Sequence, residues 1–196
     1  MGIPLRKTDK CYTYGDYKHW PEDERWEIIE GVAWNMSPAP SRRHQRFSIL
    51  LSTRIANYLV DKDCEVYYAP FDVLLPALDE QDENDVTTVV QPDISVICDT
   101  NKLTDKGCTG APDWVIEILS PYTSRKDQVI KQSLYQRHGV KEYWIADPGN
   151  SFVHVYTLDE EGNYSEEPEI FLKEDSISCL VLKGLMIDLK KIFSAD

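Results

Sequence analysis

The chain has 196 residues, of which 42% are hydrophobic and 28% are charged. These values are typical of one globular domain with a core of its own, so we expect a single domain over residues 1–196. No apolar run reaches the roughly 20 residues of a membrane span, and the N-terminal segment lacks the apolar centre of a signal peptide. We therefore expect a cytoplasmic protein that does not contact a membrane.

The formal net charge of −13 argues against a nucleic-acid partner, because DNA-binding proteins gain much of their affinity by neutralising phosphates. The charge is unevenly distributed along the chain. Residues 79–85 and 159–175 are strongly acidic, whereas 41–62 and 124–141 are rich in Lys and Arg. Two basic segments in an acidic protein are consistent with ordinary solvated helix faces, and they also leave DNA binding open.

The 5 cysteines are scattered and show no Cys-x-x-Cys spacing. An odd set without that spacing predicts neither a disulfide framework nor a zinc site. We expect all of them to be reduced thiols, some of them buried in the core.

The first half of the chain predicts one helix and several strands. The segment ERWEIIEGVAWNMSPAP indicates a helix end or a strand pair around Gly31, followed by a Pro-rich turn. Residues 41–60 carry apolar side chains at helical spacing, which predicts an amphipathic helix with Ser41 as its N-cap. The segments 64–76 and 87–98 are expected to be strands, separated by an acidic loop.

In the second half, DWVIEILS predicts a buried strand that follows a connection over residues 99–112. A helix is expected to begin at Thr123 or Ser124, where Ser124-x-x-Asp127 fits a capping box, and to end at Gly139. KEYWIADPGNSFVHVYTL predicts a strand, a tight turn and a second strand, and GLMIDLKKIF forms a short apolar segment near the C-terminus.

This order of elements predicts an α/β (α+β) domain with a central mixed β-sheet flanked by helices. A doubly wound βαβ fold fits less well, because only one convincing helix lies between strands.

The carboxylate of Glu117 lies within an otherwise apolar strand, where an unpaired charge costs several kcal/mol. Asp113 is four residues away on the same strand, about 13 Å, which is too far to share one metal ion. Asp93 follows Pro92 on a different strand, and adjacent strands lie only about 5 Å apart. Asp93 and Glu117 therefore converge if their two strands pair.

Two carboxylates this close repel each other unless a divalent cation neutralises them, and hard oxygen ligands suit Mg²⁺ or Mn²⁺. A lysine could accompany such a site from position 119, but Leu119 stands there. The nearest substitute is Lys131 on the following helix, where Asp127, Lys131 and Tyr135 form one stripe at spacing i, i+4. Lys131 could reach the sheet from the margin of the apolar face.

Asp93 after Pro92, Glu117 in VIEILSP and Lys131 in the next helix resemble the PD-(D/E)xK nuclease superfamily, with the lysine moved from strand to helix. More narrowly, WEIIEG, MSPAPSRRHQ, VVQPDISVI, GAPDWVIEILSPYTSRKD and EYWIADP, in this order, resemble the Uma-type restriction endonuclease family. The resemblance covers about residues 26–156 and leaves 157–196 as a C-terminal extension.

The resemblance implies a restriction-endonuclease-like core and Mg²⁺-dependent hydrolysis of DNA phosphodiester bonds. By this similarity, Asp93 and Glu117 would hold the metal. Lys131 would orient or deprotonate water, or stabilise the phosphate where negative charge grows. The superfamily often adds a glutamate from its first helix, and Glu27 in WEIIEG matches that phrase, with Glu30 as the alternative.

Three further residues are candidates for substrate binding. His44 follows Arg43 and could contact a phosphate or shuttle a proton, although the histidines show no metal-ligand spacing. Tyr135 could also contact a phosphate, or it could pack near the sheet. The aromatic residues Trp114, Tyr143 and Trp144 occupy strand positions and are expected in the core.

Two other functions remain open. A non-catalytic, nuclease-fold binding or interaction protein is favoured by the net charge and by Leu119. A glycosidase-like hydrolase would use two carboxylates in a cleft without a lysine or a metal. For the nuclease we expect a homodimer, because two related sites cut both DNA strands most simply.

Overall fold

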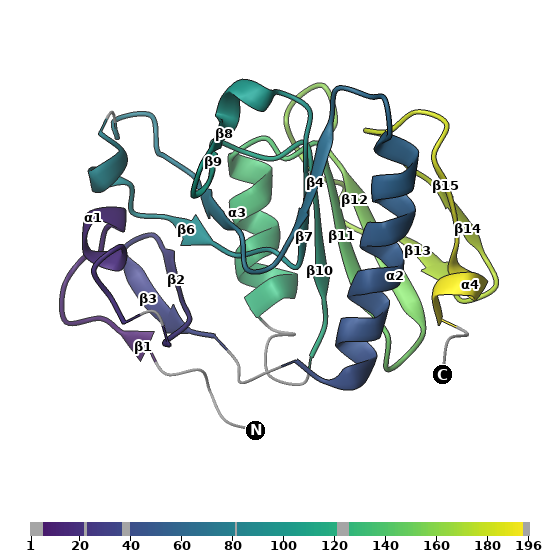
Figure 1. Cartoon of the computed structure of the whole chain (residues 1–196), viewed down its shortest axis with the longest axis horizontal. Coiled ribbons are helices and arrows are strands. Elements are labelled where there is room, and N and C mark those ends of the chain that lie inside the picture. Colours follow the sequence, from purple (N-terminus) through teal and green to yellow (C-terminus); the bar gives the residue numbers. More distant parts are fainter. Residues whose placement is uncertain (1–5, 22, 37–39, 81, 121–125, 194–196) are drawn as a thin grey trace.

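The computed structural model describes residues 6–21, 23–36, 40–80, 82–120 and 126–193. Within these ranges, two large mixed sheets and several helices form an α+β fold, which confirms the predicted class of mixed sheets flanked by helices (Figure 1). The six-stranded central sheet consists of β13 (Glu169–Leu172), β12 (Phe152–Thr157), β11 (Glu142–Asp147), β10 (Trp114–Ile118), β7 (Ile94–Ile97) and β4 (Glu65–Tyr68), in spatial order.

The second sheet contains the N-terminal strands. In spatial order it consists of β1 (Arg6–Lys7), β3 (Val32–Asn35), β2 (Trp26–Ile29), β6 (Val89–Val90), β5 (Asp72–Leu74), β9 (Gly107–Thr109) and β8 (Leu103–Thr104). A small hairpin of β14 (Ser176–Ser178) and β15 (Met186–Asp188) lies near the C-terminus. The helices are α1 (Tyr14–Tyr17), α2 (Arg42–Leu59), α3 (Gln132–Arg137) and α4 (Leu189–Phe193), with shorter turns η1 (Glu83–Asp85), η2 (Thr100–Lys102) and η3 (Lys126–Lys131).

Two segments that the sequence predicts as single strands each divide between the two sheets. The segment 64–76 forms β4 and β5, and 87–98 forms β6 and β7. Both divisions occur at a proline, Pro70 and Pro92. Proline has no N–H to donate to a strand ladder, so the chain leaves one sheet there and enters the other.

The strand-pair alternative around Gly31 is the one that the structure shows. Strands β2 and β3 pair antiparallel, and their turn residues Glu30 and Gly31 have φ angles of 50° and 76°. Two positive φ angles are what a tight hairpin turn requires, and glycine adopts them at no steric cost. A Cβ at Gly31 would also lie 2.4 Å from the sulfur of Cys11, so the position has no room for a side chain.

Helix α2 begins as predicted, because the side chain of Ser41 accepts a hydrogen bond from the backbone N–H of His44 at 3.2 Å. Its buried side chains include Phe47, Leu51 and Ile55, which pack on the central sheet. Helix α3 ends before Gly139, whose φ of 78° terminates it as expected. The predicted start at Thr123 or Ser124 lies outside the described residues; α3 instead continues from the π-helical turn η3.

The two faces of the central sheet carry separate cores. One core packs α2, α4 and the C-terminal hairpin against residues that include Trp114, Ile116 and Trp144. The other packs α3 and strands of the second sheet against residues that include Val115 and Tyr143. Strand β10 therefore alternates between the faces as its sequence predicts, and the core positions expected for the three aromatic residues are confirmed.

The prediction that all cysteines are reduced is wrong for Cys64 and Cys98, which form a disulfide. Strands β4 and β7 pair antiparallel with Glu65 opposite Ile97, so the residues just beyond that pair face each other. Their Cα atoms are 3.9 Å apart, whereas in the sequence they are 34 residues apart. Sequence spacing alone carries no signal for such a cross-strand pair.

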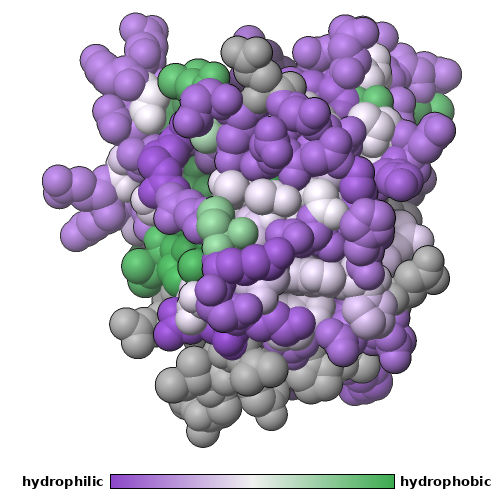
Figure 2. Space-filling view, turned by 90° about the vertical axis from the view of Figure 1, so that its left-hand side faces the viewer, coloured by the Kyte–Doolittle hydropathy of each residue, from purple (hydrophilic) through white to green (hydrophobic). Residues whose placement is uncertain are grey.

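The surface over the N-terminal strands is largely hydrophilic, with only small hydrophobic areas, as Figure 2 shows for the side that lies at the left of Figure 1. Among the described helices, none is both long and apolar enough to cross a membrane.

Candidate active site

A buried lysine lies between two buried glutamates. The Nζ atom of Lys131 is 2.7 Å from Oε1 of Glu117 and 2.7 Å from Oε1 of Glu27. The side chains of Lys131, Glu27 and Glu117 are exposed by only 3%, 0% and 4%. Charges this far from water are weakly screened, so each group depends on the others for compensation. We call Glu27, Glu117 and Lys131 the acid–lysine cluster.

Three separate elements contribute to the acid–lysine cluster. Glu117 is the fourth residue of β10, Glu27 is the second residue of β2 in the other sheet, and Lys131 ends η3. The wider π-helical turn is a rare helix form that occurs frequently at functional sites. Helix α3 packs between strands of both sheets. Lys131, which directly precedes α3, therefore reaches a carboxylate from each sheet.

Two further hydrogen bonds orient the carboxylates of the acid–lysine cluster. The hydroxyl of Tyr135 donates to Oε1 of Glu117 at 2.8 Å, and the backbone N–H of Gln91 donates to Oε1 of Glu27 at 2.9 Å. Tyr135 is fully buried and packs edge-to-face on Tyr143, with ring centroids 4.9 Å apart. Each carboxylate oxygen that contacts Lys131 is therefore held by a second donor.

Asp93 lies beside Glu117 because β7 and β10 pair antiparallel, with Ile94 opposite Ile116. This pairing is the condition under which the sequence predicts that the two acids converge. Oδ2 of Asp93 accepts a hydrogen bond from the backbone N–H of Ile118 at 2.7 Å. Within the described part of the chain, Oδ1 of Asp93 accepts no hydrogen bond, and the side chain is 21% exposed.

The candidate substrate-binding residues occupy different environments. His44, in the first turn of α2, places Nε2 3.3 Å from Oδ2 of Asp93. Arg43 precedes it on the exposed surface of the same turn. Tyr135 lies beneath Glu117 in the core, away from the surface.

The structure separates the two glutamates between which the sequence does not decide. Glu30 lies in the β2–β3 turn, where its exposed side chain forms an ion pair with Arg137. Glu27 points into the acid–lysine cluster. Leu119, at the position where a strand lysine could stand, is a partly buried apolar side chain packed against the core, and Lys131 supplies the ammonium from the helix instead.

The donor set is compatible with Mg²⁺. The described residues contain no group of three or more His, Cys, Asp or Glu side chains arranged to hold a metal ion. Asp93 and Glu117 together offer two carboxylates, and Mg²⁺ is usually held by one or two carboxylates with waters and substrate phosphate completing its octahedron. A structural zinc site would need four Cys or His ligands, which this site lacks.

Comparison with known proteins assigns the chain to a family. The model of the Uma2 family, described as "Putative restriction endonuclease", matches residues 14–190. The chain belongs to the Uma2 family. The matched range contains the whole acid–lysine cluster and Asp93, and it confirms the resemblance found in the sequence motifs.

Two known proteins resemble this Uma2 chain over most of its length. "Uncharacterized protein slr1290" from Synechocystis sp. is 26% identical over 174 residues, which cover 85% of this chain and 87% of that protein. The crystal structure of "a putative nuclease belonging to DUF820" from Anabaena variabilis superposes with a TM-score of 0.73 at 22% identity. That likeness covers 93% of this chain and 97% of the other, and it confirms the fold.

A polar network next to the acid–lysine cluster is not predicted from the sequence, and only one of its residues lies beside a motif. The side-chain Nε2 of Gln91 donates to Oδ1 of Asp72 at 2.8 Å, and the hydroxyl of Tyr17 donates to the same oxygen at 3.0 Å. Arg25 donates to Oε1 of Gln91 at 2.8 Å. Burial raises the pKa of Asp72. Gln91 directly precedes the Pro-Asp motif, which could have marked it, whereas nothing local marks Asp72.

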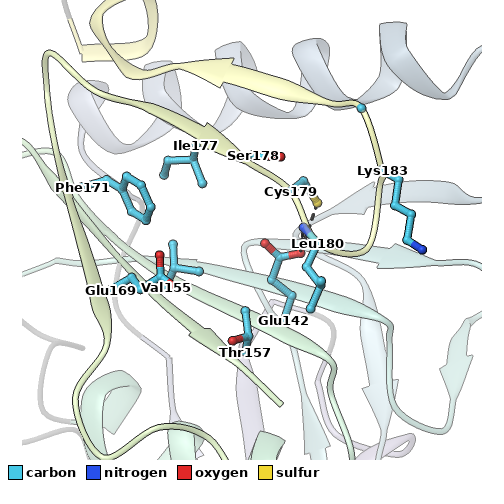
Figure 3. A pocket seen from close by; sticks show the side chains of 11 residues that line it. Glu142, Val155, Thr157, Glu169, Phe171, Ile177, Ser178, Cys179, Leu180 and Lys183 are labelled. Atoms are coloured by element: carbon cyan, nitrogen blue, oxygen red, sulfur yellow. Dashed lines mark hydrogen bonds between the residues drawn. The ribbon is translucent and has the colours of Figure 1, made fainter. Parts of the chain in front are cut away.

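A separate cavity of about 460 Å³ lies on the other face of the central sheet, between β11–β13 and the C-terminal segment (Figure 3). At its base, Glu142 accepts hydrogen bonds from the thiol of Cys179 and from the backbone N–H groups of Leu180 and Val181. Burial raises the pKa of Glu142. These bonds fix the C-terminal segment of this Uma2 chain onto the sheet, so we assign Glu142 a structural role.

Proposed function

We propose that this Uma2 protein is an endonuclease that hydrolyses DNA phosphodiester bonds with Mg²⁺ or Mn²⁺. The observation that carries the proposal is the ammonium of Lys131 held 2.7 Å from both Glu27 and Glu117. Glu117 lies on β10, whose pairing with β7 places it beside Asp93. Two carboxylates with an adjacent lysine match the chemistry that phosphodiester hydrolysis needs: a cation site and a fixed positive charge.

Asp93 and Glu117 would hold the cation. When bound there, it would polarise a phosphate oxygen and favour ionisation of a water molecule. The chain contributes pre-set ligand orientations: the N–H of Ile118 and the ring of His44 hold Oδ2 of Asp93, and Tyr135 with Lys131 holds Oε1 of Glu117. Ligands that are already oriented lose little conformational freedom on binding.

Lys131 acts as a fixed cation in this proposal. Its Nζ atom is held between two carboxylates, and in this proposal it would orient the attacking water or bind the phosphate. A buried positive charge next to the phosphate stabilises the negative charge that grows in the transition state. Glu27 positions Lys131 and is in turn positioned by the N–H of Gln91.

The first turn of α2 is suited to a neighbouring phosphate. The N-terminus of an 18-residue helix attracts anions through its dipole. Arg43 adds an exposed positive charge at this turn, and His44 connects it to Asp93. Tyr135, buried behind Glu117, has a positioning role in this arrangement.

The proposal includes a DNA substrate and a homodimer, which follow from the sequence resemblance and from the geometry of double-strand cleavage. It also includes the cytoplasmic location expected from the sequence. The rival function is a non-catalytic binding protein on the same fold, which the net charge of −13 favours. A glycosidase-like reaction is disfavoured, because Lys131 lies between Glu27 and Glu117.

The test is plasmid nicking with Mg²⁺ or Mn²⁺, together with calorimetric titration of the metal. In Glu117→Gln and Asp93→Asn we expect metal binding to be lost and nicking to fall by about 10²–10³-fold. The matched control is Asp113→Asn, because Asp113 also follows a proline and precedes the same strand, at the end remote from Glu117.

The control should retain both metal binding and nicking, with its folding checked by circular dichroism. A wild type that binds no divalent cation at millimolar concentration contradicts the proposal. A wild type that binds DNA equally well with and without metal, and does not cut it, supports the rival function.

A further inference from the structure

A cavity of about 360 Å³ is lined by Gln91, which hydrogen-bonds to Glu27 of the acid–lysine cluster. It is lined by Tyr67, Phe71, Asp72 and Gln91, together with the turn between β8 and β9 at residues 104–107. Its volume is within the range of small-molecule sites, and it joins aromatic surface with a few polar groups.

Two backbone hydrogen bonds connect this cavity to the acid–lysine cluster and to Asp93. Gln91, whose side chain lines the cavity, donates its backbone N–H to Glu27 at 2.9 Å. Ala69, in the connection that carries Phe71, donates its N–H to the carbonyl oxygen of Asp93 at 3.1 Å. Gln91 and Asp93 are two residues apart in the chain, at most about 7 Å, so a DNA strand with a phosphate at Asp93 could place a neighbouring nucleotide at the cavity.

The aromatic wall of the cavity suits a flat ring. Tyr67 and Phe71 stack with ring centroids 4.2 Å apart and planes within 9° of each other. Both side chains are partly exposed, so the stack is accessible from the cavity. Nucleobases stack on such rings with little dependence on their identity.

The polar wall offers a hydrogen-bond acceptor. Oδ1 of Asp72 accepts from Gln91 and Tyr17, which fixes the carboxylate. Among the described residues, no donor bonds to Oδ2 of Asp72. The described lining of the cavity carries the carboxylates of Asp72 and Asp105 and one ammonium, that of Lys106. This balance favours the base of a nucleotide over its phosphate.

We propose that this cavity binds one unstacked nucleobase of the DNA strand being cut, with its ring on the Tyr67–Phe71 stack and its exocyclic amino group donating to Asp72. Adenine, cytosine and guanine carry such an amino group, whereas thymine presents carbonyl oxygens that a carboxylate repels. The inference rests on the proposed nuclease function for its substrate.

The test is a titration of the full chain with deoxyadenosine, deoxycytidine and thymidine, followed by amide chemical shifts in NMR spectra. Nucleosides lack phosphate, so their binding does not depend on a metal. We expect saturable shifts at residues 69–72 and 104–107 with the first two nucleosides, and weaker binding of thymidine.

Two variants sharpen the test. Phe71→Ala should weaken deoxyadenosine binding about tenfold, because it removes part of the stacking surface. Asp72→Asn should reduce the preference over thymidine, because an amide can also donate to thymine carbonyls. The matched control is Phe152→Ala, which removes another stacked, partly exposed ring, on β12. This control should bind deoxyadenosine as the wild type does.

The outcomes separate this inference from the proposed function. A wild type that nicks plasmid but shows no shifts at these residues with any nucleoside overturns the base site alone. Nucleoside shifts that persist unchanged in both Phe71→Ala and Asp72→Asn also overturn it. Nucleoside binding by a wild type that does not nick DNA supports the base site and contradicts the proposed cleavage.

Discussion

The variant Lys131→Met tests whether the acid–lysine cluster is a mutually compensated set of buried charges. Methionine retains most of the apolar stem of lysine and removes only the ammonium, which lies 2.7 Å from each glutamate. Glu27 and Glu117 would then be two carboxylates with 0% and 4% exposure and no shared cation. Removing one partner of a buried ion pair typically costs about 3–5 kcal/mol, and we expect a loss of that size.

The magnitude should depend on pH. Two carboxylates this close and this far from water cannot both stay charged without a cation, so the folded variant should bind a proton that the unfolded chain does not bind. Folding that takes up a proton is favoured at low pH, so the loss in the free energy of unfolding should be smaller at pH 5 than at pH 8. Replacing both glutamates by glutamine in the Lys131→Met background should restore most of the lost stability, because no unpaired charge remains buried.

The assay is equilibrium urea unfolding followed by the fluorescence of the 5 tryptophans at both pH values. The matched control is Lys141→Met. Lys141 also contacts a carboxylate, that of Asp113 at 2.6 Å, but the Lys141 side chain is 64% exposed while that of Asp113 is 7% exposed. Water can reach the Lys141 end of the pair, and the backbone N–H of Cys98 still donates to Asp113, so this control should lose clearly less stability than Lys131→Met. If Lys131→Met loses no more stability than Lys141→Met at pH 8, the reasoning is refuted.

Two further predictions concern the strand β10 and its neighbours. Burial raises the pKa of Asp113, but hydrogen bonds from Lys141 and the backbone of Cys98 lower it by more, so its net pKa is below the usual value. The ionised Asp113 carboxylate therefore contributes fully to stability above the pKa of an unfolded aspartate, and this contribution disappears as pH falls through the folded pKa. Below about pH 4, the free energy of unfolding should fall less steeply with acidification in Asp113→Asn than in the wild type. An equal acid dependence in wild type and variant would contradict this. Replacing Cys64 and Cys98 by serine should lower the free energy of unfolding by about 3–4 kcal/mol, which is the chain-entropy value for a closed loop of 34 residues. A reducing agent should destabilise the wild type and leave the double variant unchanged. A cysteine-to-serine change at the exposed Cys11 serves as the control.

Local patterns predict several elements of the fold. The alternation along β10 shows in advance that Val115 and Glu117 share one face and that Trp114 and Ile116 share the other, because strand geometry repeats every two residues. The spacing of apolar residues after Ser41 predicts α2 and its cap for a similar reason. Such features depend on neighbours within one turn or one strand, and the sequence displays those neighbours directly.

Other local predictions fail where two alternatives agree with the same residues. A continuous strand over residues 64–76 fits the apolar pattern, but the proline at position 70 diverts the chain into the second sheet. The capping box at Ser124 lies outside the described residues and stays a prediction.

The sequence by itself determines the family motifs and the candidacy of Asp93, Glu117 and Lys131, because each depends on residue type and spacing along one segment. That Asp93 lies beside Glu117 depends on the pairing of β7 with β10, which the structure shows. Only the tertiary structure decides that Glu27 and not Glu30 meets Lys131, and that Gln91 connects this cluster to Asp72. Those contacts join residues from β2, β5, β10 and η3, which are distant in the chain. Their proximity comes from packing the two sheets around α3, and no local pattern in the sequence records how two sheets pack.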